Sequence, residues 1–258
     1  MMKKYTPTTQ GVILAARFSL PAYQNDSCGN DEGREQGLKQ IHEFLTTKSS
    51  ESQEAVVEIL STFKTLIPYL NAIKKYTGEE TFHIRNVQIY CLGVDSIENN
   101  FFGSEISHYT FPWVLSELKD QKMHPKAIEN LKHSAPDPFM PFHSYHVFLD
   151  GFVNYGKDNF LKGITNCMVN HGVVKEVKDD GKKLVVRTFR LVLQSGSLFL
   201  LGTESEVEFN KEYFVDSLKT YDKVAIHQGH VFKLLADVDY SRLMARNQQV
   251  VDIFKRFR

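Results

Sequence analysis

Hydrophobic residues in the first 165 positions recur at spacings of three and four, which is the period of a helix with one buried face. The clearest stripe runs from Val56 to Ile73. Pro68 lies inside it and predicts a kink or a break between two helices. The same period predicts further helices over residues 34–47, 84–97, 105–119, 125–133, 143–155 and 158–167. We therefore expect this part of the chain to be an array of helices.

Hydrophobic and polar residues begin to alternate at Val173, as in strands that are buried on one face. Asp179-Asp180-Gly181 and Gln228-Gly229 interrupt the alternation and are hairpin signals. The alternating stretches cover residues 173–177, 184–193, 198–201, 205–209, 222–227 and 230–235. About five short antiparallel strands of this kind predict a small barrel or sandwich.

The last residues return to a helical period, with one hydrophobic seam from Tyr240 to Phe257. Together these patterns predict an α+β fold. A multi-helix domain would span residues 1–165, and a small antiparallel β domain with a C-terminal helix would span residues 166–258.

The composition of the chain argues against several classes of function. The chain has 31 basic and 31 acidic residues, so it lacks the basic excess of a nucleic-acid-binding groove. No stretch approaches the ~20 apolar residues of a spanning helix, so we expect no membrane partner. The chain has only three cysteines, a small and odd number that does not suit a disulfide framework. This number favours a location in the reducing cytoplasm.

The sequence lacks the glycine-rich phosphate loops, the nucleophile elbow and the paired-cysteine or histidine motifs of common enzymes. The strongest candidate for chemistry is His143 with His146, because two histidines three apart on a helix project from one face. Cys28, Cys167 and His227 are the other candidates. Cysteine and histidine together can bind zinc, nickel or iron.

Three hypotheses follow. These five residues could be metal ligands, with Arg17 and Asp31 orienting them. Alternatively, Cys28 could be a nucleophile with His143 or His146 as its base. Finally, all of them could simply pack in the core of a non-catalytic scaffold or interaction protein.

The chain also resembles an uncharacterised bacterial family of unknown function. Members carry an alanine-arginine-aromatic run, a tyrosine-cysteine-glycine-proline loop and a histidine-histidine-serine-phenylalanine-histidine-valine-phenylalanine segment. The resemblance covers most of the chain. Two departures stand out: Asn30 replaces the loop proline, and Phe142 replaces the first histidine. The matching residues here are Ala16-Arg17-Phe18, Ser27-Cys28-Gly29-Asn30, Phe142–Phe148, Ile67–Leu70, Tyr90–Gly93, Asn166-Cys167 and Ile226-His227.

The resemblance implies no established activity. It does place Cys28 and the other four candidates on family motifs, and it suggests a link to nickel–iron hydrogenase maturation. The leading expectation is a metal-binding accessory protein with a partner protein, whose oligomeric state stays open. We expect His143 and His146 to be mostly buried, where the two predicted domains join. We also expect the Cys28 sulfur within about 6 Å of one of their ring nitrogens, because ligands of one zinc ion lie close together.

Overall fold

The structure is a computed structural model that describes residues 5–26, 33–95, 104–120, 125–135, 139–154, 156–214 and 217–255. The chain forms two compact units. The first comprises Met1–Cys91 and Asp95–Ile128, and the second comprises Leu92–Val94 and Glu129–Arg258. The described part of the first unit is helical, whereas the second combines helices with strands. The predicted α+β fold class is confirmed.

The helices that begin in the first unit are α1 (Pro7–Gln24), α2 (Arg34–Thr47), α3 (Ser50–Ser61), α4 (Leu66–Thr77), α5 (Ile84–Leu92), α6 (Ser104–Asp120) and α7 (Pro125–Ser134). Capping residues fix the ends of several of these helices. The Thr6 and Ser49 side chains accept hydrogen bonds from backbone N–H groups in the first turns of α1 and α3. Gly78 ends α4 with a positive φ of 74°, which glycine adopts at little cost.

The predicted interruption near Pro68 occurs, but it lies a few residues earlier. Helix α3 ends at Ser61, and α4 begins at Leu66. Pro68 is the third residue of α4, where its missing N–H would have had no partner inside the helix. Among the described helices none is by itself long and apolar enough to cross a membrane. The α3–α4 pair passes that test only jointly, with a bend of 104° between its helices.

Helix α1 approaches the turn before α5 closely. A Cβ atom at Gly11 would lie 1.8 Å from the Phe82 carbonyl oxygen, so a side chain at this position cannot be accommodated without movement. Nearby, the Phe18 and Tyr90 rings pack edge to face with their centroids 6.0 Å apart. Cys91, in α5, is fully buried. The interior of the first unit thus depends on a backbone contact that only glycine allows.

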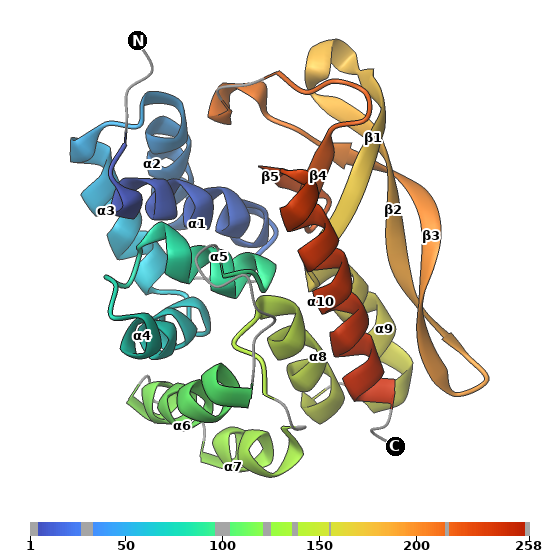
Figure 1. The fold of residues 1–258 in the computed structure, drawn as a ribbon. Coiled ribbons are helices and arrows are strands. Elements are labelled where there is room, and N and C mark those ends of the chain that lie inside the picture. The colour runs from blue at the N-terminus through green and yellow to red at the C-terminus, as the bar shows by residue number, and fades with distance from the viewer. Residues whose placement is uncertain are drawn as a thin grey trace. The chain divides into compact units, whose positions relative to one another are not determined.

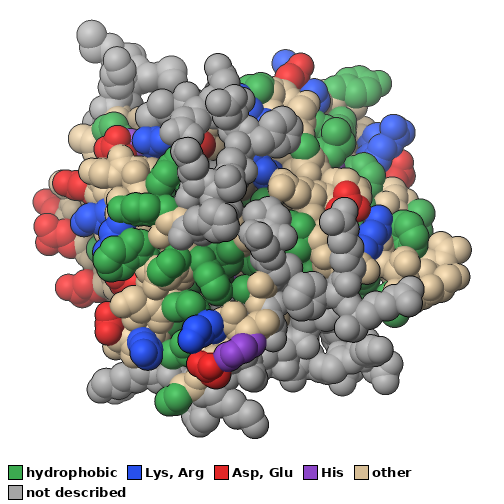
Figure 2. Space-filling view, turned by 60° about the horizontal axis from the view of Figure 1, so that its bottom comes forward, with side chains coloured by type: hydrophobic (Ala, Val, Ile, Leu, Met, Phe, Trp, Pro, Cys, Tyr) green, Lys and Arg blue, Asp and Glu red, His purple; other side chains and the backbone are tan. Residues whose placement is uncertain are grey.

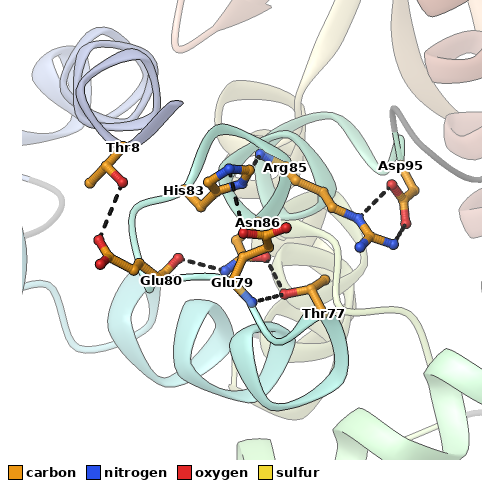
Figure 3. A network of polar contacts seen from close by, with 8 residues as sticks. All are labelled: Thr8, Thr77, Glu79, Glu80, His83, Arg85, Asn86 and Asp95. Carbon is orange, nitrogen blue, oxygen red and sulfur yellow. Dashed lines mark hydrogen bonds and ion pairs between the residues drawn. The ribbon is translucent and has the colours of Figure 1, made fainter. Parts of the chain in front are cut away.

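A polar network surrounds the start of α5 (Figure 3). Arg85 makes two hydrogen bonds to the Asp95 carboxylate, at 2.9 and 2.8 Å, and both side chains are largely buried. The Asn86 side chain donates to the Glu80 carbonyl oxygen and accepts from the Thr77 hydroxyl. These bonds satisfy polar groups that would otherwise be costly to bury, so the network is structural.

The surface of the first unit carries aromatic side chains on α6. Tyr109 and Trp113 are 46% and 40% exposed, and the Lys75 ammonium lies 3.7 Å from the centre of the Trp113 ring. Figure 2 shows hydrophobic side chains at the surface on this side of the molecule, with charged side chains among them. The centre of the Tyr109 ring also lies 5.9 Å from that of the Tyr76 ring, and a small exposed aromatic cluster of this kind does not by itself indicate a binding surface.

The second unit contains α8 (His143–Asn154), α9 (Gly156–Cys167), β1 (Asn170–Lys178), β2 (Lys183–Gln194), β3 (Ser197–Glu208), β4 (Lys223–His227), β5 (His230–Leu235) and α10 (Asp237–Lys255). The strands form a closed barrel in the order β1-β2-β3-β5-β4. All neighbours are antiparallel except β3 and β5. Alternate strand residues fill its interior, among them Val174, Leu184, Val186, Val224 and Ile226.

Both predicted hairpin turns are present. Asp179–Gly181 forms a single 3₁₀ turn between β1 and β2, and Gln228-Gly229 joins β4 to β5 with two positive φ angles. The two stretches expected over residues 198–209 instead form the single strand β3, which pairs along its whole length with β2. In Figure 1 the β2–β3 hairpin extends beyond the rest of the barrel.

The change from helix to strand falls between Cys167 and Asn170, close to the predicted position. Helices α8 and α9 nevertheless belong to the same compact unit as the barrel. Helix α10 packs along α8 and along strands β1, β3, β4 and β5, as its position in Figure 1 illustrates. The barrel, α8 and α10 therefore share one interior, and the candidate site lies there.

Candidate functional site

The predicted histidine pair lies in the first turn of α8. The helix is initiated at Phe142, whose carbonyl oxygen accepts the first helical hydrogen bond from the His146 N–H at 3.1 Å. Both histidines are buried, since each residue is only 8% exposed. Phe142, Tyr145 and Phe148 are fully buried beside them. The prediction that both histidines are mostly buried is confirmed.

His143 meets two further predicted residues. Its ring lies edge to face against the His227 ring on β4, with the centroids 5.0 Å apart. Its Nε2 atom is 3.1 Å from the Cys167 carbonyl oxygen at the end of α9. Because a carbonyl can only accept, Nε2–H donates, and Nδ1 is then the ring nitrogen with a lone pair. Residues from α8, α9 and β4 thus meet at one imidazole.

The Cys167 thiol also takes part in this arrangement. Gln228, in the β4–β5 turn, donates from Nε2 to the Cys167 sulfur at 3.4 Å, and the Gln228 N–H donates to the Asn166 carbonyl oxygen at 3.1 Å. These two bonds hold the turn against the end of α9. We refer to His143, His146, Cys167 and His227 together as the His143 centre.

Burial controls protonation in the His143 centre. Loss of water contact lowers the pKa of His143 well below its usual value, and the nearby His227 and His146 lower it further. Burial also lowers the pKa of His146, although the negative charge of Asp150 acts in the opposite direction. Burial raises the pKa of the Cys167 thiol. At neutral pH His143 and His146 are therefore neutral, which is the form that binds metals, whereas Cys167 is a thiol rather than a reactive thiolate.

Two more side chains fix the segment between α9 and β1. The Ser144 hydroxyl accepts a hydrogen bond from the Val169 N–H at 2.9 Å, and Asn247 of α10 donates to the Val169 carbonyl oxygen at 2.8 Å. All three residues are buried. The backbone beside Cys167 is consequently held by α8 on one side and by α10 on the other.

Four of the five predicted ligand residues thus lie in the second unit, where His143 contacts the His227 ring and the Cys167 backbone. The fifth, Cys28, lies outside the described residues, as does Asp31, so their predicted roles stay predictions. Arg17 is on α1 in the first unit, where burial lowers its pKa to about 10.

Sequence reasoning missed Asp150, Ser144, Gln228 and Asn247. Asp150 is one turn beyond His146 in α8, so its spacing was a usable signal. Ser144 follows His143 and Gln228 follows His227, but the sequence assigned neither side chain a hydrogen-bonding role, and Asn247 has no histidine near it in the sequence.

In the described part of the chain, no three His, Cys, Asp or Glu side chains are arranged as a ready-made metal cage. In the His143 centre, His143 contacts the His227 ring and the Cys167 backbone, and the described residues form no completed coordination sphere. The residue types of this centre and its neutral histidines are suited to zinc, nickel or iron, as the sequence led us to expect.

Comparison with known proteins identifies the family to which the chain belongs. A family model described as a family of unknown function matches residues 7–257, nearly the whole sequence. The chain belongs to this family, DUF6390. Searches among curated proteins and among solved structures gave no match. Membership in DUF6390 agrees with the resemblance drawn from the sequence, and it assigns no activity.

Proposed function

We propose that this DUF6390 protein is a metal-binding accessory protein that holds a transition-metal ion at the His143 centre. The observation that carries the proposal is the contact of His143 with both His227 and Cys167 inside one compact unit. A ring-centroid separation of 5.0 Å lets two imidazoles share one ion after modest rotation.

The ligand atoms follow from the hydrogen bonds. His143 would bind through Nδ1, because its Nε2–H is engaged by the Cys167 carbonyl oxygen. This bond to a backbone carbonyl is the kind of contact that orients metal-binding histidines elsewhere. Cys167 would bind as the thiolate, so metal uptake would release its proton and would weaken as the pH falls.

Binding requires movement in the His143 centre. Because the described residues form no completed cage, the rings of His143 and His227 and the Cys167 side chain would rotate toward a common point. The Gln228 bond to the Cys167 sulfur would be exchanged for the metal–sulfur bond. Such a site would bind less tightly than a preformed one, because part of the binding energy is spent on rearrangement. Moderate affinity suits a protein that passes its ion to a partner protein in the cytoplasm, as in metalloenzyme assembly.

A cysteine–histidine enzyme is less well supported. The raised pKa of the half-buried Cys167 thiol disfavours it as a nucleophile. A nucleophilic role for Cys28 stays a prediction, because Cys28 lies outside the described residues. A scaffold without a ligand is the third reading, and metal analysis separates it from the first.

The test is elemental analysis of protein purified without a histidine tag, followed by calorimetric titration with Zn²⁺ and Ni²⁺. We expect one ion per chain and loss of binding in His143→Asn and His227→Asn. His133→Asn is the matched control, since His133 is an exposed histidine paired with Glu129 on α7. Wild-type protein that neither contains nor binds an ion would refute the proposal. So would equal binding by all three variants.

A further inference from the structure

Strand β3 keeps one long edge without a paired strand in the part of the chain that the structure describes. It pairs with β2 at twelve residues, but with β5 only where Glu208 lies opposite His230. The edge of β3 that faces away from β2 is thus unpaired over residues 197–206. Much of it belongs to the hairpin that extends beyond the barrel in Figure 1. Such an edge offers a row of backbone donors and acceptors to another strand.

The two halves of this edge differ in charge. The second half carries Glu204, Glu206 and Glu208, and all three residues are exposed. Charged side chains of this kind keep a strand edge from pairing with other molecules. The first half, residues 197–203, contains no charged residue and no proline. It therefore lacks two of the features that commonly protect an exposed edge.

The first half also exposes large hydrophobic side chains. Phe199 is 41% exposed and Leu201 is 48% exposed, and both side chains are on one face because the residues are two apart in a strand. Helix α10 packs along β3, and the Lys255 ammonium lies 4.7 Å from the centre of the Phe199 ring, yet both residues keep this exposure. An uncharged edge with hydrophobic side chains beside it is suited to pairing with an apolar strand.

The order of residues in β3 makes a second copy of this strand a matching partner. If Leu200 lies opposite its own counterpart in an antiparallel pair, Phe199 of each copy lies opposite Leu201 of the other. These four side chains would then gather on one face, as cross-strand pairs do. Glu204 would lie opposite Gly196 in the turn, so no carboxylate would face another carboxylate.

Other strand pairings between two copies fit less well. A register centred on Ser205 would set Glu204 of each copy opposite Glu206 of the other, and like charges directly opposite are unfavourable. The outer edge of β2 is partly occupied, because the Asn170 side chain donates to a β2 carbonyl oxygen there. Arg190 also places a charge in that stretch of β2. The first half of β3 is therefore the edge that suits self-pairing.

We propose that the protein forms a symmetric dimer in which residues 197–203 of β3 pair antiparallel with the same residues of a second copy. Leu200 would lie at the two-fold axis. Backbone hydrogen bonds would fix the register, and the cluster of Phe199 and Leu201 from both copies would be removed from water. Because a two-fold contact uses the same patch on both subunits, association stops at two chains. The inference does not depend on metal binding.

Sedimentation equilibrium of the full-length protein over about a hundredfold range of concentration tests dimerisation. We expect the mass to rise from the 29.7 kDa of one chain toward twice that value. Leu201→Glu should weaken dimerisation by about tenfold or more, because the new carboxylate would be buried beside Phe199 of the second copy. Within one chain the same carboxylate is tolerated, since Arg190 of β2 lies opposite position 201.

Leu193→Glu is the matched control. Leu193 is also 48% exposed, but it is on β2, and its pairing with Leu198 places it on the opposite face of the hairpin from Leu201. This variant should dimerise like the wild type. Equal weakening by the two glutamate variants would overturn the proposal, as would a dimer that persists unchanged in Leu201→Glu.

Hydrogen exchange of the wild-type protein at low and high concentration locates the contact. Backbone amides of residues 197–203 should exchange more slowly at high concentration, whereas those of residues 205–208 should not change. A monomer at every concentration, an assembly larger than two chains, or protection that leaves out residues 197–203 would each overturn the proposal. If Leu201→Glu fails to fold, these wild-type measurements decide the question.

Discussion

Acid should destabilise the second unit, and the contribution of His171 can be calculated. Its pKa is about 4 in the folded protein, against an ordinary value of 6.5. Between these two pKa values, His171 is protonated in the unfolded chain and neutral in the folded protein. The resulting stability is fully present above pH 6.5 and is lost as the pH falls toward 4. Between about pH 7.5 and about pH 4.5 the loss from this residue is about 2.5 kcal/mol.

That loss is large beside a typical total stability of about 5–15 kcal/mol. His143 and His146 add to it with the same sign, because burial lowers the pKa of each. The assay is urea unfolding at the two pH values. Pulsed hydrogen exchange at one fixed pH then reads out the β1 and β2 peptides, so the first unit does not contribute to the signal.

The variant His171→Phe isolates the residue. Whatever its stability at neutral pH, the difference between the two pH values should shrink by about 2.5 kcal/mol relative to wild type. The matched control His133→Asn, at an exposed histidine, should keep the wild-type pH dependence. An unchanged pH dependence in His171→Phe would refute the reasoning.

Three substitutions test the packing. Gly11→Ala should destabilise the first unit by about 1–3 kcal/mol in Trp113 fluorescence melts, because its Cβ would collide with the Phe82 carbonyl; wild-type stability would contradict this. Asp95→Asn removes the carboxylate that balances the charge of the largely buried Arg85 and should cost about 3–5 kcal/mol by the same melts, and a loss below 1 kcal/mol would show that the pair is dispensable. Ser144→Ala strips the Val169 N–H of its acceptor and should cost about 1–3 kcal/mol in the exchange assay, whereas faster exchange confined to α8 would argue against the contact.

Periodicity carried most of the fold prediction. The change of period at Val173 located the barrel, and the Gln228-Gly229 turn was found because a tight hairpin requires positive φ at both positions. Strand β3 was divided in two because Gly202 and Thr203 weaken the alternation, but twelve paired residues of β2 hold it together. Pairing with β2 thus outweighed the weak alternation of residues within β3.

The helix boundaries near Pro68 and after Leu92 were less predictable. A proline within a helical period marks an interruption, but it is tolerated in a first turn, so the break could lie before it. Helix α5 ends at Leu92, with Gly93 at a positive φ of 65°. The Gly93 carbonyl oxygen accepts from Arg246, a contact that sequence spacing cannot reveal.

For the candidate site, spacing identified His143 and His146 only as a pair. Their meeting with Cys167 and His227 depends on how α8, α9 and the barrel pack, and the family motifs were the only advance signal. The contacts of Asn247 could not be predicted because a lone buried amide has no periodic signature, and the predicted Gln228-Gly229 turn gave no sign of the Gln228 bond to Cys167. What such residues do follows from the hydrogen bonds they satisfy.

The most direct test of metal binding at the His143 centre is titration of the tag-free protein with Co²⁺, followed by absorption spectroscopy. We expect one equivalent to produce visible bands of a four-coordinate ion and a near-ultraviolet sulfur-to-cobalt charge-transfer band. Cys167→Ser should remove the charge-transfer band alone, and His143→Asn should weaken both. A spectrum that stays that of the hydrated ion, or a charge-transfer band that survives in Cys167→Ser, would contradict the account.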